Sequence, residues 1–459
     1  MHPDQANADH QRPSPARRVA SVGDAAVLLF LPCAPGAEAL LADEVRQLLG
    51  NGAAVQAERG GVRVTGNAVS AMRLNLQSRL AQRVLWPLAH GPYENEHDLY
   101  ALARSVPWAD WISNAQTFRI DTTAQRSPLQ SLNFATLRVK DAVCDVMRDA
   151  TGERPSINTK FPDLPLTLHL SPSHATLYAD TSGEALFKRG WRDAQGLKGE
   201  APLKETLAAA MLAAAGWRGR LEDGPLFDPC CGAGTIAIEA AQIACGIAPG
   251  LQRRFAFERL LPFRSHQNTW SKLKDAARAA QHAPQVKIYA GDVSYRMTDF
   301  AQRNAERAGV ADAIDFKTAD ALQRPPPGEA GAAGVMLNNP PYGERIDPRG
   351  TRGDGDGRSP GPAGASGHAS ASGPASRQGF EGGGSPDDFF SQLATHWKRH
   401  YPGWTAWLLS PDPRLPKMLR FKESRRVPMW NGAIECRLFR FDLVAGSARA
   451  KPAAEPPPA

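Results

Sequence analysis

Two short segments of the chain combine residue types that can bind a cofactor and an amine. The first is residues 226–235 (LFDPCCGAGT), in which Asp228 ends an apolar stretch and Gly232 and Gly234 follow. Glycines at a strand-to-helix turn let a ligand approach the backbone closely. A dinucleotide or an adenosine-containing cofactor would both lie beyond the carboxyl end of such a strand.

The positions of the acidic residues favour one of these two ligands. A dinucleotide site needs an acid about 20 residues after the turn, whereas the first acid to end a second strand here is Asp292. Asp228 lies in the turn itself, where its carboxylate could contact a positively charged amino-acid group. The pattern therefore favours S-adenosylmethionine over NAD.

Two further acids follow the next two apolar strands. Asp292 could accept hydrogen bonds from both ribose hydroxyls, and Asp320 could accept one from the adenine amino group. Asp292 alone is equally well explained as a turn or helix-capping residue, and Asp320 alone is better explained as a turn residue. Three acids after three successive strands, however, indicate one cofactor site made of Asp228, Gly232, Gly234, Asp292 and Asp320.

The second segment is residues 338–345 (NNPPYGER), directly after an apolar strand. Pro340 and Pro341 fix the chain and leave backbone carbonyls exposed, Asn339 adds a side-chain oxygen, and Tyr342 offers a ring for stacking. Two acceptors that converge on an exocyclic NH₂ group draw its lone pair toward the reactive geometry and tolerate positive charge in the transition state. Asn339, Pro340, Pro341 and Tyr342 are therefore the candidate catalytic residues.

Alternating strands and helices place both segments at one edge of a sheet. The expected strands are residues 226–228, 286–290, 314–317 and 334–337, with helices at 203–215, 236–244 and 299–308 between or before them. This alternation is typical of a doubly wound α/β domain. A further helix (388–399), a strand (404–409) and a hairpin around Asn431-Gly432 should complete it.

The residues before this domain show a mixed α+β pattern. Apolar spacing predicts helices at 37–49, from Ala71 to Leu85, and at 134–147, with strands at 27–31, 61–64, 117–121, 166–170 and 176–180. Residues 1–22, 447–459 and the Gly/Ser/Pro-rich stretch 347–386 contain too few bulky apolar residues to form a core, so we expect them to be flexible.

At these residues the chain resembles the class I S-adenosylmethionine-dependent methyltransferases that carry an Asn-Pro-Pro-Tyr motif. Enzymes with this motif act on adenine N6, on guanine N2 or on a glutamine side chain. Four further stretches indicate which of these enzymes the chain resembles: residues 138–142 (RVKDA), 188–192 (KRGWR), 201–210 (APLKETLAAA) and 431–438 (NGAIECRL). With them, the chain is similar to the bacterial THUMP-domain 23S rRNA guanine-N2 methyltransferases of the RlmL type.

This resemblance implies a fold class and a domain order. It implies a Rossmann-like class I methyltransferase domain at residues 182–446 with an insertion at 347–386. An α+β ferredoxin-like segment at 23–69 and a THUMP RNA-binding domain at 70–181 would precede it. The implied activity is methyl transfer to the N2 amine of a guanine in 23S rRNA, with the five cofactor residues and the four catalytic residues above in those roles.

An RNA substrate requires cationic contacts and access to a base. A buried base edge cannot reach a methyl donor, so the nucleotide must be extruded or lie in a loop. Arg138, Lys140, Arg189 and Arg192 are candidate phosphate contacts, although each alone is better explained as ordinary solvated surface. Methylation of guanine N2 in tRNA, of adenine N6 or of a protein glutamine stays open, as does a non-catalytic RNA-binding role in ribosome assembly.

Composition and charge limit the classes of protein to which the chain can belong. The net charge of +7 permits a nucleic-acid partner without requiring one. The sequence contains no apolar run of about 18 residues, the length that would predict a membrane span. Residues 1–18 also lack the apolar core of a secretion signal. The six cysteines form no metal-binding or disulfide pattern. We expect a cytoplasmic protein that needs no metal.

Overall fold

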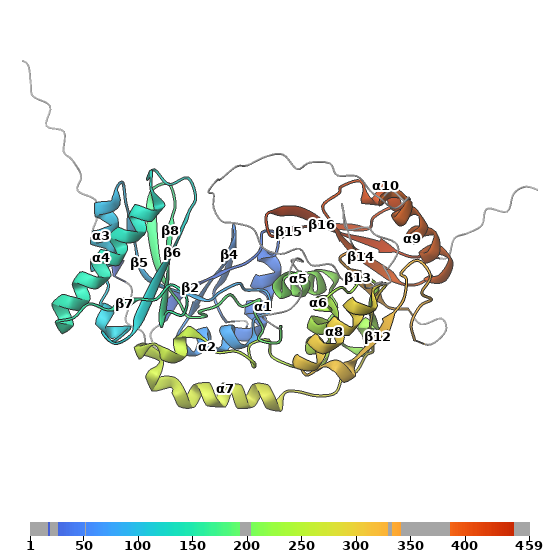
Figure 1. Ribbon diagram of the computed structural model, residues 1–459, viewed down its shortest axis with the longest axis horizontal. Helices are drawn as coiled ribbons and strands as arrows, with labels where there is room; N and C mark the ends of the chain where they lie inside the picture. Colours follow the sequence, from blue (N-terminus) through green and yellow to red (C-terminus); the bar gives the residue numbers. More distant parts are fainter. Residues whose placement is uncertain are drawn as a thin grey trace, which may run out of the picture.

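The computed structural model describes residues 17–18, 26–50, 52–192, 203–328, 333–340 and 386–444. Two α/β units lie side by side, with strands β5 to β8 at one end, β2 and β4 near the middle, and strands β12 to β16 toward the other end (Figure 1). The predicted flexible segments 1–22, 347–386 and 447–459 fall almost entirely outside the described residues. None of the described helices is long and apolar enough to cross a bilayer.

The first unit is built on one nine-stranded sheet. Eight of its strands run in the order β3-β4-β2-β5-β9-β8-β6-β7, and β1 pairs with β5. The segments expected to be ferredoxin-like and THUMP therefore share a continuous sheet, joined where β5 pairs with β9 and β2. Its elements are β1 (Arg17–Arg18), β2 (Val27–Pro32), α1 (Glu38–Leu49), β3 (Val55–Glu58), β4 (Gly61–Gly66), α2 (Ala68–Gln77), β5 (Leu85–Pro92), α3 (Glu96–Arg104), β6 (Thr117–Ala124), α4 (Leu132–Thr151), β7 (Ser156–Ile157), β8 (Leu164–Leu170) and β9 (His174–Asp180).

Helix α2 is shorter than the sequence pattern predicts. The apolar spacing suggested a helix from Ala71 to Leu85, but α2 ends at Gln77 and Leu85 already begins β5. The buried carboxylate of Glu44 on α1 accepts hydrogen bonds from the Ser78 hydroxyl, 2.6 Å, and from the Arg79 amide, 2.8 Å. These bonds satisfy groups just past the helix end, so the chain can leave the helix there.

The second unit is a seven-stranded sheet in the order β12-β11-β10-β13-β14-β16-β15. The first five strands are parallel, and β16 pairs with β14 and β15 in the antiparallel sense. Every expected strand and helix of this region is present within a few residues. Its elements are α5 (Glu205–Ala215), β10 (Leu226–Asp228), α6 (Thr235–Ala244), α7 (Gln267–Ala279), β11 (Ile288–Asp292), α8 (Tyr295–Arg307), β12 (Ile314–Thr318), β13 (Val335–Asn338), α9 (Pro386–His400), β14 (Thr405–Ser410), α10 (Leu415–Leu419), β15 (Arg425–Asn431) and β16 (Ile434–Asp442).

The two units are packed together through a common apolar core. One continuous cluster of buried residues runs from Leu29 and Leu41 of the first unit to Ile236 and Ala240 on α6. A second cluster, around Phe227, lies between the other face of the sheet and α9. The strand that leads into the glycine-containing turn is therefore held from both faces.

Charged groups are also buried at this junction. Glu239 on α6 accepts hydrogen bonds from Arg189, 2.9 Å, and from Arg79, 3.3 Å, and its side chain is 0% exposed. Arg79 belongs to the first unit, Arg189 to the segment that leads out of it, and Glu239 to the second unit. We call these three residues the junction ion cluster.

Candidate active site

The glycine-containing turn has the geometry that the sequence predicts. Strand β10 ends at Asp228, and α6 begins at Thr235 directly after Gly234. Gly232 and Gly234 have φ values of +49° and +81°, in the left-handed region that favours glycine. A Cβ on Gly234 would lie 3.0 Å from the Cβ of Ala301 on α8, whereas a Cβ on Gly232 would meet nothing closer than 3.9 Å. The backbone at Gly232 is thus open to a ligand.

Asp228 is a buried carboxyl whose hydrogen-bonding capacity is only partly used. It is 1% exposed, and its Oδ1 has no hydrogen-bond partner among the described residues. Burial raises the pKa of Asp228 well above its usual value; the Cys230 amide opposes this rise and the nearby Asp292 charge adds to it. A buried carboxylate calls for a cation or strong donors, which the ammonium group of an amino-acid moiety would supply.

Asp292 and Asp320 surround the same turn. Asp292 accepts hydrogen bonds from the backbone amides of Gly232 and Ser294, both 3.0 Å, so it holds the glycine turn against the end of β11. Asp320 accepts one from the Leu322 amide, 2.9 Å. Burial, followed by the charges of Asp228, Asp292 and Asp320, raises the pKa of the Cys230 thiol well above its usual value. The three predicted acids therefore converge around Cys230.

The candidate catalytic segment begins at the same edge of the sheet. Strand β13 lies beside β10, with Val335 opposite Leu226 and Met336 opposite Phe227, so Asn338 and Asn339 emerge next to Asp228. The Oδ1 atom of Asn339 and both polar side-chain atoms of Asn338 are buried without partners in the described part of the chain. Pro340 is buried, while Pro341 and Tyr342 lie outside the described residues.

Sequence reasoning did not single out Asn338. The only available signal was a polar residue that ends an otherwise apolar strand next to the Asn-Pro-Pro-Tyr motif. In the structure Asn338 is 1% exposed, and both polar atoms of its amide are unpaired among the described residues at the end of β13, the strand that lies beside β10. Unpaired buried polar groups are rare in folded proteins, so this edge of the sheet is built to meet a polar ligand.

These residues fit S-adenosylmethionine. The left-handed glycines leave the backbone open, Asp228 can meet an ammonium group, and the carboxylates of Asp292 and Asp320, near the same turn, are acceptors that suit hydroxyl and amino groups. The unpaired oxygen of Asn339 is then free to accept a hydrogen bond from an amine. In the described ranges, no group of three or more His, Cys, Asp or Glu side chains is arranged to hold a metal ion.

Arg192, predicted to contact RNA, instead lies beside the glycine turn. It forms an ion pair with Glu205 and donates hydrogen bonds to the Leu203 carbonyl, 3.0 Å, and the Thr235 hydroxyl, 2.7 Å. Thr235 is the first residue of α6. The guanidinium therefore joins the start of α5 to the start of α6, immediately after the predicted cofactor loop.

Arg189 occupies a position that contradicts a phosphate contact. It is 2% exposed, belongs to the junction ion cluster, and donates further hydrogen bonds to the carbonyls of Leu186, 2.9 Å, and Arg79, 2.8 Å. A guanidinium buried and paired in this way cannot reach a phosphate. The sequence could not reveal this, because Glu239 lies 50 residues further along the chain.

Arg138 and Lys140 lie half-exposed on α4 of the first unit. The Arg138 guanidinium packs 4.6 Å from the centre of the Tyr100 ring, and Lys140 forms an ion pair with Asp141 at 2.7 Å. Both side chains are accessible, so they remain candidates for RNA contacts.

Three models of known protein families match parts of the chain. Residues 28–85 match the RlmL ferredoxin-like domain, residues 93–180 the THUMP domain, and residues 189–353 the RMKL-like methyltransferase domain. Curated relatives named ribosomal RNA large subunit methyltransferase K/L include those of Syntrophotalea carbinolica, 35% identical, and Shewanella amazonensis, 36% identical. Each alignment covers 92% of this chain and 54% of the relative, so the chain spans about half the length of these relatives.

Solved structures share the architecture across nearly the whole chain. A possible methylase from Clostridium difficile 630 is 25% identical with a TM-score of 0.74, covering 95% of this chain and 100% of its own. A predicted N6-adenine-specific DNA methylase from Listeria monocytogenes is 26% identical with a TM-score of 0.73, covering 91% and 96%. SMU.472, crystallised with SAH, shares the fold at 24% identity and a TM-score of 0.74, covering 91% and 98%. The predicted fold class is confirmed.

Proposed function

The chain belongs to the family that joins an RlmL ferredoxin-like domain, a THUMP domain and an RMKL-like methyltransferase domain, and on this premise we propose that it methylates ribosomal RNA. The methyl group comes from S-adenosylmethionine, and the acceptor is the exocyclic N2 amine of a guanine in 23S rRNA. Such a substrate places the protein in the cytoplasm. The names of the curated relatives, which state large-subunit rRNA methylation, support the substrate class.

One observation carries the proposal. The unpaired Oδ1 of Asn339 and the unpaired carboxyl oxygen of Asp228 are buried at the carboxyl ends of two adjacent parallel strands. The Asp228 oxygen can bind an amino-acid ammonium group, and the Asn339 oxygen can bind an aromatic amine. The first ligand is then the methyl donor, and the second, bound next to it, is the methyl acceptor.

The residues then have distinct tasks. Bound S-adenosylmethionine supplies an electrophilic methyl group. Asp228 binds the ammonium group of the donor. Asp292 binds the ribose and holds the glycine turn, and Asp320 accepts a hydrogen bond from the adenine amine. The Asn339 side chain and the Pro340 carbonyl accept hydrogen bonds from the guanine N2 hydrogens and orient its lone pair toward the methyl carbon.

Proton removal needs no strong base on the protein. Guanine N2 becomes positively charged as the new N–C bond forms, and its remaining protons then become acidic. Asn339 and Pro340 stabilise that charge as acceptors, and a proton passes to water. The guanine must leave its stack to reach this site, and a THUMP domain with accessible Arg138 and Lys140 on α4 is suited to bind the flanking RNA.

The test is methyl transfer to 23S rRNA purified from cells that lack this protein. Isotopically labelled S-adenosylmethionine and the full chain are added, the RNA is digested, and the nucleosides are identified by mass spectrometry. We expect labelled N2-methylguanosine in 23S rRNA and none in 23S rRNA from wild-type cells. No labelled nucleoside in this 23S rRNA would contradict the proposal, and a parallel reaction on purified tRNA that alone gave label would select tRNA as the substrate.

Adenine N6 is the second candidate acceptor. A solved structure with the same fold is described as a predicted N6-adenine-specific DNA methylase, and the two acceptors converging near Asn339 would suit an adenine amine equally well. Labelled N6-methyladenosine in the same digest would select this reaction and exclude guanine N2.

A further inference from the structure

We propose that the chain has a second nucleotide site, which binds an unpaired RNA nucleotide where the N-terminal sheet meets the β15–β16 hairpin. A cavity of about 1070 Å³ lies there. This inference deepens the proposed function, because it presupposes an RNA partner. The lining residues on which the argument rests are Phe30, Arg59, Arg63, Tyr178, Pro428 and Trp430.

Phe30 and Trp430, both partly exposed, offer flat surfaces for a base, and the buried Tyr178 ring supports Phe30. The rings of Phe30 on β2 and Tyr178 on β9 lie 6.1 Å apart, and the Arg63 guanidinium lies 5.5 Å from the centre of the Phe30 ring. Trp430, half-buried on β15, lines the cavity from the second unit. Proteins bind unpaired RNA bases by stacking them on aromatic rings and on arginine planes.

One cation at the cavity is available to a phosphate. Glu58 pairs with Arg63 at 2.7 Å and Asp121 pairs with Arg119 at 2.7 Å, while Glu38 keeps its charge and accepts hydrogen bonds from two backbone amides. Arg59 is exposed and has no acidic partner among the described residues. Its guanidinium is thus placed to contact a phosphate.

The cavity is held at a fixed position relative to the candidate active site. Gly36, with φ +85°, lies so close to β15 that an added Cβ would be 2.2 Å from the Pro428 carbonyl oxygen. The first unit therefore contacts the hairpin directly, near the middle of the molecule (Figure 1). Strand β15 is four strands from β10 in the sheet, which at about 4.8 Å per strand separates the two sites by roughly 20 Å.

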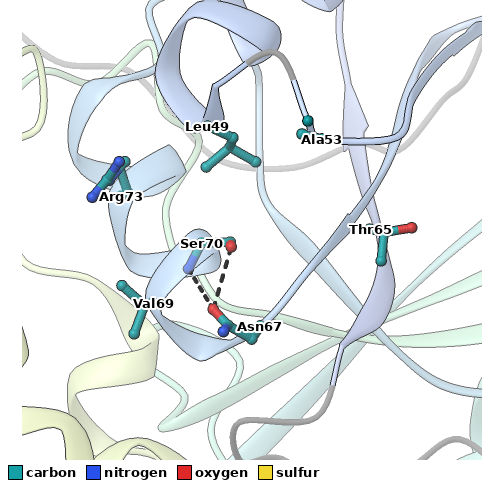
Figure 2. A pocket seen from close by; sticks show the side chains of 8 residues that line it. Leu49, Ala53, Thr65, Asn67, Val69, Ser70 and Arg73 are labelled. Atoms are coloured by element: carbon teal, nitrogen blue, oxygen red, sulfur yellow. Dashed lines mark hydrogen bonds between the residues drawn. The ribbon is translucent and has the colours of Figure 1, made fainter.

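A smaller pocket in the first unit lacks these features. Its volume is about 490 Å³, and no aromatic ring lines it. Figure 2 shows that the Asn67 side chain accepts hydrogen bonds from Ser70 there, and these bonds cap α2. Arg73 donates a hydrogen bond to the Leu48 carbonyl at 3.3 Å. Its polar groups serve the local fold, so the nucleotide site belongs to the larger cavity.

The experiment measures binding of a fluorescein-labelled, single-stranded 12-nucleotide RNA of mixed sequence to the full chain by fluorescence anisotropy. We expect Arg59→Glu and Trp430→Ala each to raise Kd by about 5- to 100-fold, the range given by loss of one stacked base or one phosphate contact. Trp430→Phe should restore most of the affinity. Arg278→Glu on α7, an exposed arginine far along the chain that pairs with Asp275, is the matched control and should change Kd less than twofold.

Several outcomes overturn the inference. One is a Kd within twofold of wild type for both Arg59→Glu and Trp430→Ala, and another is equal weakening by the Arg278→Glu control. Displacement of the RNA by micromolar GMP or AMP would mark a free-nucleotide site instead. Methyl transfer to 23S rRNA, measured in parallel, distinguishes failure of this site from failure of the proposed function, since the site can be absent while transfer persists.

Discussion

At the scale of single residues, two acids of the candidate site differ because their surroundings differ. Asp292 accepts hydrogen bonds from two backbone amides and holds the glycine turn in place. Asp228 is more deeply buried and keeps an unpaired oxygen. Asp292 thus contributes to the fold without a ligand, whereas the buried charge of Asp228 costs stability until a ligand neutralises it.

Replacing Asp228 with asparagine should stabilise the ligand-free protein while it weakens cofactor binding. Because burial raises the pKa of Asp228, the folded state holds a proton there more tightly than the unfolded chain does. Ionisation therefore destabilises the fold above the raised pKa, and this cost disappears as the pH falls toward the unfolded value of about 3.9. Thermal unfolding should show a higher Tm for Asp228→Asn at pH 8 and a smaller difference near pH 5.

The readout for the cofactor is calorimetry with S-adenosylmethionine, in which Asp228→Asn should lose at least tenfold in affinity. Asp442→Asn, on the exposed end of β16, is the control. A Tm for Asp228→Asn below that of wild type at pH 8 would mean that another group already compensates the buried charge.

Asn339→Ala should lower turnover by about 10²–10³-fold, the typical cost of removing one oxygen or donor that stabilises developing charge. S-adenosylmethionine affinity should change little, because Asn339 is predicted to contact the acceptor amine and not the donor. Single-turnover methyl transfer and calorimetry measure the two quantities separately. Turnover close to that of wild type would remove Asn339 from the reaction.

At the scale of elements, Arg192 links the starts of α5 and α6 next to the glycine turn. A lysine cannot make these three contacts at once, since it lacks the planar fork of donors. Arg192→Lys should therefore weaken S-adenosylmethionine binding by about tenfold, equivalent to about 1.4 kcal/mol. RNA binding without cofactor should be unchanged.

Arg138→Lys on α4 is the matched comparison, because its guanidinium is accessible and packs on Tyr100. It should leave cofactor affinity as it is. If Arg192→Lys weakens RNA binding and leaves cofactor binding intact, then Arg192 contacts RNA as its sequence context first suggested.

Local sequence patterns predicted most helices and strands, and they failed where contacts between distant residues determine the structure. The turn from Asp228 to Thr235 was predictable because the strand, the glycines and the helix are adjacent in the sequence. The end of α2 was not, since Glu44 reaches it from another helix. The burial of Arg189 depends on Glu239, 50 residues away, and Asn338 is recognisable only by the lack of a partner in the fold.

At the scale of the whole molecule, the junction ion cluster connects the first unit to α6, the helix that follows the glycine turn. Glu239→Gln would leave Arg79 and Arg189 buried without their carboxylate. Breaking one partner of a buried ion pair destabilises a protein by about 3–5 kcal/mol. Chemical denaturation should show this loss, whereas Glu435→Gln, in an exposed pair with Arg437, should cost less than about 1 kcal/mol.

The position of Glu239 also limits how the chain can be divided. Its two cationic partners both come from residues before 190, outside the α/β half that contains the glycine turn. A fragment beginning at residue 203 would retain every predicted catalytic and cofactor-binding residue but lose both cationic partners of Glu239 and the apolar residues of the first unit that pack against α6. Expression of that fragment alone should therefore give an unstable polypeptide, because the half with the glycine turn folds against the preceding half.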